Sequence, residues 1–93
     1  MIQSFADRVT RALFEDGACD ARWRAFEAVA LRKLDFLDNA VSLNDLRSPP
    51  GNRLEPLKGN RAGQHSIRIN DQWRLCFRWG AKGPEDVAIV DYH

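Results

Sequence analysis

The chain ends in Asp91, Tyr92 and His93, which together supply a carboxylate, a phenol and an imidazole. Histidine titrates nearest neutral pH, so His93 can serve as a general acid or a general base. Tyr92 can orient or stack a nucleobase, and Asp91 can orient His93 or assist a proton transfer. These residue types suit proton transfer at a ribose 2′-hydroxyl. The alternative is a solvated chain terminus that only closes a strand.

Basic residues are concentrated in one stretch of the chain, residues 47–78. This stretch holds seven basic and two acidic residues, a net charge of +5, whereas residues 1–46 carry a net charge of −2. Six of the seven are arginines, whose planar guanidinium groups suit bidentate contacts to phosphate. Lys58, Arg68, Arg74 and Arg78 offer fixed positive charge, and the candidates for RNA binding are Arg53, Arg61, Arg68 and Arg78. The stretch is predicted to bind an anion, with an ordinary solvated surface as the alternative.

The sequence contains no pattern typical of a metal or nucleotide site. No carboxylate pair or His/Cys cluster has metal-ligand spacing, and no glycine-rich phosphate loop is present. Cys19 and Cys76 are expected to be unpaired thiols. The N-terminus lacks the apolar run of a signal peptide, and no later segment approaches membrane-spanning length. We therefore expect a cytoplasmic protein without a metal, cofactor or membrane contact.

Two helices are predicted in the first half of the chain. They are expected to pack against the sheet that carries the candidate residues. Asp7 is a candidate N-cap for the first helix, which Gly17 ends. In residues 21–40 apolar side chains recur at spacings of three and four, which predicts a longer helix with one buried stripe. The segment Asn44–Asn52 combines proline and glycine with polar residues, so it is expected to be a loop.

A period of two in the second half predicts strands. In residues 73–79 the apolar side chains point one way, and Arg74 and Arg78 point the other. Residues 66–69 alternate in the same manner and connect to this strand through a short hairpin. Arg68, Arg74 and Arg78 are therefore expected to share a basic outer face of the sheet.

The remaining strands complete a single predicted domain over residues 1–93. A last strand is expected at 86–90, and residues 54–58 are a candidate edge strand because Pro56 removes an amide donor. The fold class is α+β, with two N-terminal helices packed on a mainly antiparallel sheet. Strict alternation would place Asp91 and His93 on one side of the last strand and Tyr92 on the other.

Several stretches together resemble the HigB-type toxins, also called plasmid-maintenance killer proteins, a branch of the RelE superfamily. The resemblance covers nearly the whole chain. It includes the opening residues 1–7, the helix segment 31–35 and the run Ser42-Leu43-Asn44-Asp45-Leu46. It continues through residues 49–61, residues 66–74 and the terminal Asp-Tyr-His.

This resemblance implies a RelE-like microbial RNase fold and toxicity through cleavage of translated messenger RNA in the ribosomal A site. It implies a HigA-like helix-turn-helix antitoxin, operator DNA contacted only through that antitoxin, and no cofactor. The residues that match the family's catalytic end are Asp91, Tyr92 and His93. Lys58 matches a basic residue of the Leu-Lys-Gly turn, and Arg74 matches a position associated with phosphate contact.

The chain departs from the family pattern at Glu55, where some relatives studied as RNases have a histidine that contributes to catalysis. Two other functions therefore stay open at this point. One is a non-catalytic inhibitor that binds the ribosome or another target such as gyrase. The other is a decayed toxin that binds only its antitoxin.

Overall fold

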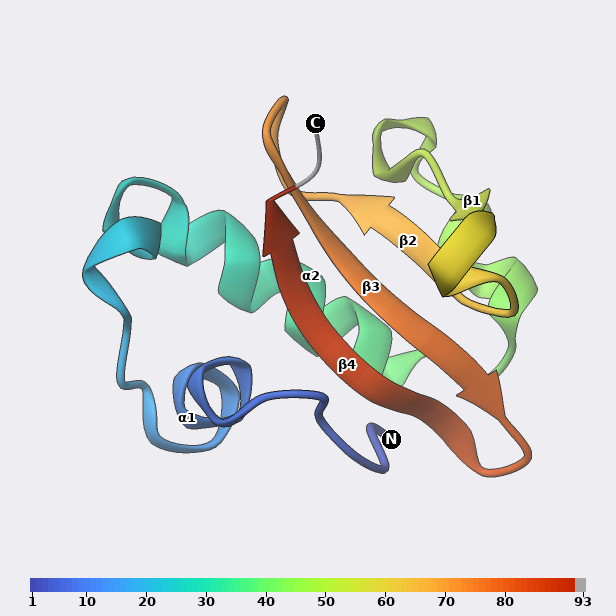
Figure 1. Ribbon diagram of the computed structural model, residues 1–93, viewed down its shortest axis with the longest axis horizontal. Coiled ribbons are helices and arrows are strands. Elements are labelled where there is room, and N and C mark those ends of the chain that lie inside the picture. The colour runs from blue at the N-terminus through green and yellow to red at the C-terminus, as the bar shows by residue number, and fades with distance from the viewer. Residues whose placement is uncertain (92–93) are drawn as a thin grey trace.

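Two α-helices and a four-stranded antiparallel sheet form the computed structural model, which describes residues 1–91 (Figure 1). The helices are α1 (Arg8–Asp16) and α2 (Glu27–Asn39). The strands follow the chain order across the sheet: β1 (Glu55–Pro56), β2 (His65–Arg68), β3 (Trp73–Gly80) and β4 (Gly83–Asp91). The predicted α+β class, with helices preceding an antiparallel sheet, is confirmed.

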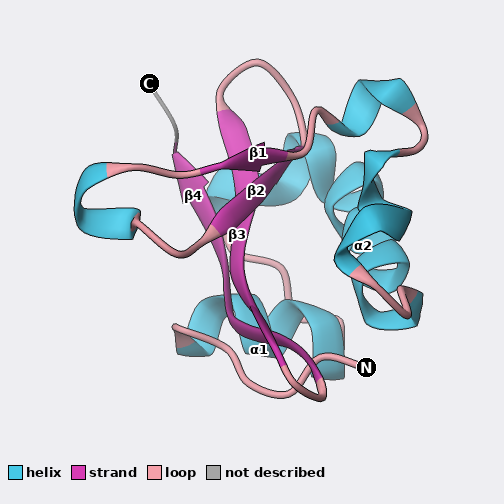
Figure 2. Ribbon diagram, turned by 90° about the vertical axis from the view of Figure 1, so that its right-hand side faces the viewer, coloured by secondary structure: helices cyan, strands magenta, loops and turns pink. Residues whose placement is uncertain are grey.

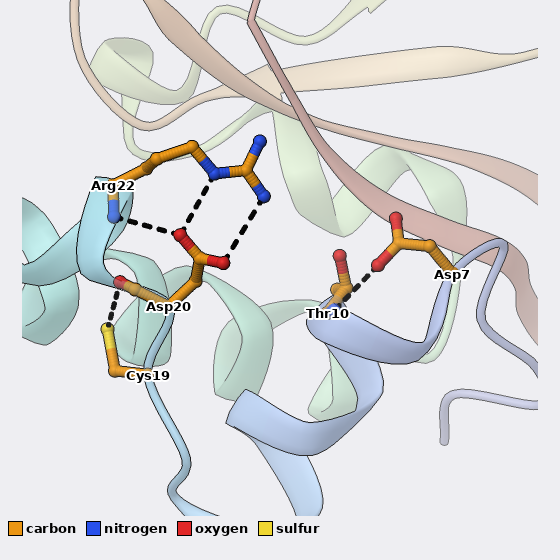
Figure 3. A network of polar contacts seen from close by, with 5 residues as sticks. All are labelled: Asp7, Thr10, Cys19, Asp20 and Arg22. Atoms are coloured by element: carbon orange, nitrogen blue, oxygen red, sulfur yellow. Dashed lines mark hydrogen bonds and ion pairs between the residues drawn. The ribbon is translucent and has the colours of Figure 1, made fainter.

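Helix α1 has the boundaries that its capping residues predict. The Asp7 carboxylate accepts a hydrogen bond from the Thr10 amide at 2.6 Å, as Figure 3 shows. Gly17 adopts a left-handed conformation with φ 71° and directs its amide back to the last turn. Both ends of the helix therefore satisfy backbone groups that would otherwise lack partners.

The second predicted helix, residues 21–40, is divided in the structure. A 3₁₀ helix, η1 (Ala21–Phe26), precedes α2, and the Asp20 carboxylate caps it by accepting from the Arg22 amide (Figure 3). Phe26 leaves the helical region with φ −125° and ψ 21°. Its ring packs on Trp73 of β3 with centroids 5.6 Å apart, a tertiary contact that periodicity does not encode.

The segment between α2 and the sheet is a connection, as expected, and contains two short 3₁₀ turns. These are η2 (Leu43–Arg47) and η3 (Pro50–Asn52). The Asn52 side chain is fully buried and donates to the Leu46 carbonyl at 3.3 Å. The Lys33 ammonium donates to Asn52 Oδ1, which ties this connection to α2. Burial, together with the charges of neighbouring arginines, lowers the pKa of Lys33.

The two faces of the sheet differ in what they contact. The helix-side face carries Leu75 and Phe77, which are fully buried with Ile67 and residues of both helices in the main core. The opposite face, here called the outer face, carries the cross-strand pairs Ser66–Cys76 and Arg68–Arg74. Figure 2 shows the sheet nearly edge-on, with α2 on one side and the connection between β1 and β2 on the other.

Strand β4 is longer than the predicted 86–90 and contains an irregularity. The register shifts between Cys76 and Arg78 of β3, and Asp86 on β4 has a positive φ of 52°. The N-terminal segment lies along this part of β4 through a parallel bridge between Phe5 and Val87. No helix within residues 1–91 is both long and apolar enough to span a bilayer.

Candidate anion-binding face of the sheet

The register places the three predicted arginines on the outer face. Arg68 of β2 and Arg74 of β3 are direct cross-strand partners, so their side chains leave the sheet on the same side. Arg78 lies four residues beyond Arg74 on β3. The register shift places its extra residue on β4, between Glu85 and Ala88, so the alternation of β3 keeps Arg78 on that side. The prediction that these three residues share one face is therefore confirmed.

Arg74 is the most buried of these three arginines. The residue is only 8% exposed, so the alternative of an ordinary solvated surface does not hold at this position. Its Nε donates to Ser66 Oγ at 2.8 Å, and its Nη2 donates to the Arg53 carbonyl at 2.6 Å. A guanidinium can be buried when its donors are satisfied, and these two bonds provide such partners.

The residues on either side of β1 contribute to the burial of the outer face. Arg53 adopts a left-handed conformation with φ 47°, and its carbonyl accepts the bond from Arg74. Leu57 is 7% exposed and, like the fully buried Cys76, lies outside the main core. Burial raises the pKa of the Cys76 thiol, and the charges of Arg61 and Arg74 oppose that rise.

Glu55 faces the same arginine from the edge strand. It pairs with Ser66 in the register, and its Oε1 lies 3.8 Å from Arg74 Nη1. The Glu55 side chain is 49% exposed, whereas that of Arg74 is 10% exposed. The carboxylate thus remains accessible to water beside a buried cation, and it reduces the local positive charge.

Carboxylates also accompany the other two arginines of the face. Arg68 forms an ion pair with the fully exposed Asp71. Arg78 Nε lies 3.5 Å from Asp86 Oδ2, and both side chains are about half exposed. Ion pairs in contact with solvent are weak, so a phosphate group can compete with these carboxylates for the arginines.

The remaining predicted cations border this face. Lys58 is exposed and directly precedes the 3₁₀ turn η4 (Gly59–Arg61), which joins β1 to β2. Arg61 is partly buried, and its Nη1 donates to Gln64 Oε1 at 3.5 Å. Arg53 is exposed, although its backbone carbonyl accepts a hydrogen bond from Arg74. Basic residues therefore lie on both sides of β1 in the sequence, with Arg53 before it and Lys58 and Arg61 after it.

The predicted catalytic end is described only as far as Asp91. Asp91 pairs with Trp73, whereas its neighbour Val90 pairs with Arg74, so the Asp91 side chain belongs to the helix-side face. Gln72 Nε2 donates to Asp91 Oδ2 at 3.1 Å. Tyr92 and His93 lie outside the described residues, and their assignment to the site stays a prediction. Figure 1 shows that β4 ends beside the β2–β3 hairpin.

Sequence reasoning missed Ser66 and the Arg53 carbonyl. Ser66 is fully buried and alternates in phase with Arg68, which was the one signal that it belongs to the outer face. A backbone carbonyl gives no sequence signal. Within residues 1–91, no group of three or more His, Cys, Asp or Glu residues is arranged to hold a metal, and no pocket opens.

Two solved structures share this fold at low sequence identity. A YafQ mutant from E. coli has a TM-score of 0.61 at 17% identity, covering 98% of this chain and 91% of that one. A chain of the YoeB–YefM complex from Staphylococcus aureus has a TM-score of 0.62 at 18% identity, covering 100% and 98%. The predicted RelE-like fold is thereby confirmed.

Sequence similarity then defines the family. Residues 3–93 match the family described as RelE-like toxin of type II toxin-antitoxin system HigB. Toxin HigB-1 from Vibrio cholerae is 45% identical over 96 residues, covering 99% of this chain and 94% of that relative. Endoribonuclease HigB from Proteus vulgaris is 29% identical over 93 residues, and this match covers 100% of both chains. The chain belongs to the HigB-like toxin family of type II toxin–antitoxin systems.

Proposed function

We propose that the chain is a toxin that cleaves messenger RNA on the ribosome without a metal ion. The observation that carries the proposal is the buried, doubly hydrogen-bonded Arg74, which lies on one face with Arg68 and Arg78. Membership of the HigB-like family supports a toxic role, and the Proteus vulgaris relative is named an endoribonuclease. Arginines held in this way suit the phosphate of an RNA substrate.

The proposed reaction uses the substrate's own 2′-hydroxyl as the nucleophile. A general base, for which His93 is the candidate, removes its proton, and the oxygen attacks the adjacent phosphorus. The bond from phosphorus to the 5′-oxygen of the next nucleotide breaks, and that oxygen gains a proton. Arg74 and Lys58 stabilise the negative charge that develops on the phosphate oxygens. Tyr92 stacks on or orients a base beside the scissile bond.

The ribosome supplies what a small chain lacks. An outer face without a pocket in residues 1–91 offers little surface to hold a flexible RNA strand in line for attack. A ribosome holds the message and can present its backbone to the basic face. We therefore propose that free RNA is a poor substrate and that messenger RNA bound to a translating ribosome is the preferred substrate.

The proposed partners follow from the same role. A HigA-like helix-turn-helix antitoxin would neutralise the chain, and operator DNA would be contacted only through that antitoxin. A chain of the solved YoeB–YefM complex shares the fold, which supports the binding of this chain by an antitoxin. The ribosome and its messages lie in the cytoplasm, which is where we propose that the chain acts.

Mapping of cuts on programmed ribosomes tests the proposal. Purified protein should cut the bound message in the presence of EDTA at a concentration that leaves ribosomes intact. The upstream product should carry a 2′,3′-cyclic phosphate and the downstream product a 5′-hydroxyl, and a deoxyribose at the attacking position should stop the reaction. Binding without cuts would instead support a non-catalytic inhibitor. Products with a 5′-phosphate would overturn the mechanism.

Deletion of His93 tests the predicted proton-transfer group. The deletion should abolish cleavage, because His93 is the candidate that titrates nearest neutral pH. Circular dichroism should show an unchanged fold. Growth arrest at the wild-type level by the folded deletion variant would remove His93 from the mechanism.

A further inference from the structure

The Arg74 guanidinium is fixed along one edge by the protein itself. Nε and Nη2 lie on the same side of the planar group, and they donate to Ser66 Oγ and to the Arg53 carbonyl. The Nη1 atom lies at the other end, 3.8 Å from Glu55 Oε1. Two donors held on one edge determine both the position and the plane of the group.

Both acceptors are held in place by further contacts. Ser66 is fully buried in β2 and pairs with Glu55 on one side and Cys76 on the other. Arg53 follows Asn52, which is fully buried and hydrogen-bonded to the preceding connection and to Lys33 of α2. The Arg53 carbonyl is therefore anchored through Asn52 to α2.

We propose that Ser66 is a positioning residue for the cleavage reaction, acting through its hydrogen bond to Arg74. The Ser66 hydroxyl and the Arg53 carbonyl hold the Nε–Nη2 edge, so that the end of the guanidinium that includes Nη1 meets the scissile phosphate. An arginine fixed in advance stabilises transition-state charge without first having to reorganise. This inference rests on the proposed function, because it requires that Arg74 contacts the phosphate.

A purely structural role for Ser66 makes a different prediction. Loss of a buried hydrogen bond would then lower stability and would leave the cleavage rate of the folded protein unchanged. A positioning role lowers the rate of the chemical step more than it lowers ribosome binding. Stability and chemistry must therefore be measured on the same variants.

Ser66→Ala removes the hydroxyl, and Ser66→Thr retains it. The matched control is Thr10→Val, since Thr10 is also fully buried and its Oγ1 accepts from the Ile89 amide at 3.1 Å, a bond that does not involve Arg74. Thr10→Val should lower the melting temperature and leave the cleavage rate of the folded protein within about twofold. Ser66→Cys keeps the side-chain volume with a weak acceptor, and it replaces Ser66→Ala if that variant does not fold.

The experiment is single-turnover cleavage on programmed ribosomes, with ribosome affinity measured separately. We expect Ser66→Ala to cleave roughly 10- to 100-fold more slowly than the wild type, with affinity within about twofold, and Ser66→Thr to restore most of the rate. In ¹⁵N spectra the Arg74 Nε–H of the wild type should exchange slowly, and that protection should be lost in Ser66→Ala.

The outcomes separate the two proposals. A wild-type protein that cleaves, together with a folded Ser66→Ala variant that cleaves at the same rate, overturns the positioning role and leaves the nuclease in place. An equal loss of rate in folded Thr10→Val also overturns it, because the effect would then follow from any buried hydroxyl. A wild-type protein that binds ribosomes and cuts nothing overturns the proposed function and this inference with it.

Discussion

The two faces of the sheet bury different kinds of side chains by different means. On the helix-side face, Leu75 and Phe77 are fully buried by contact with apolar side chains of the helices and neighbouring strands. On the outer face, Arg74 is nearly as buried, but hydrogen bonds from its guanidinium accompany that burial. One face gains stability from removing apolar surface from water, and the other spends stability to hold a charge in one orientation.

This difference predicts how each face responds to substitution. A substitution on the helix-side face should act through folding and should affect every function of the chain equally. A substitution on the outer face should affect the cleavage or binding of RNA more than it affects folding. The following variants test that contrast.

The largest expected effect is the loss of a core ring. Phe77→Ala should lower the free energy of unfolding by about 3–5 kcal/mol, because it removes a fully buried aromatic side chain and leaves a cavity. Urea unfolding followed by circular dichroism measures this loss. If the stability of Phe77→Ala matched that of the wild type, the helix-side face would not be the principal source of stability.

Arg74→Met should have the opposite balance of effects, with a larger loss of cleavage than of folding stability. Methionine roughly preserves the length of the side chain and removes the charge. Loss of the hydrogen bonds to Ser66 Oγ and to the Arg53 carbonyl should lower the free energy of unfolding by about 1–3 kcal/mol, less than the loss in Phe77→Ala. Cleavage should fall by roughly 100- to 1,000-fold, in the range measured when one transition-state hydrogen-bond donor is removed. Single-turnover cleavage and urea unfolding on the same sample test both parts. If Arg74→Met lowered the free energy of unfolding as much as Phe77→Ala does, Arg74 would be mainly a structural residue.

The sequence predicted the faces of the strands better than their burial. Alternation correctly placed Arg68, Arg74 and Arg78 on one side, because the period of a strand is a local property of the backbone. It could not show that Arg74 is buried. That burial depends on Arg53, which lies 21 residues earlier, and on a backbone carbonyl that carries no side-chain signal.

The same limit explains the local errors. The break at Phe26 accompanies packing against Trp73, and the irregularity at Asp86 accompanies the docking of the N-terminal segment on β4. Each is a contact between distant parts of the chain. The caps of α1 were predictable because Asp7 and Gly17 act on the backbone within a few residues.

A smaller effect is expected at the exposed end of the outer face. Arg78→Met should weaken ribosome binding and reduce the slope of log affinity against log salt by about one unit if one phosphate contact is lost. Arg8→Met is the matched control, because Arg8 is an exposed arginine in the first turn of α1. It should leave the slope unchanged. The same reduction in both variants would indicate a response to net charge and not to a specific contact.

The smallest effect should be a gain, at the carboxylate that accompanies Arg78. Asp86→Asn removes the charge 3.5 Å from Arg78 Nε, and asparagine tolerates the left-handed backbone of this position, with φ 52°. Because the pair is half exposed, release of Arg78 should strengthen ribosome binding by only about two- to fivefold at low salt. Asp35→Asn on α2 makes the same change in net charge away from the outer face and should leave the affinity nearly unchanged. If Asp86→Asn bound more weakly than the wild type, the carboxylate would be orienting Arg78 for RNA and not competing with it.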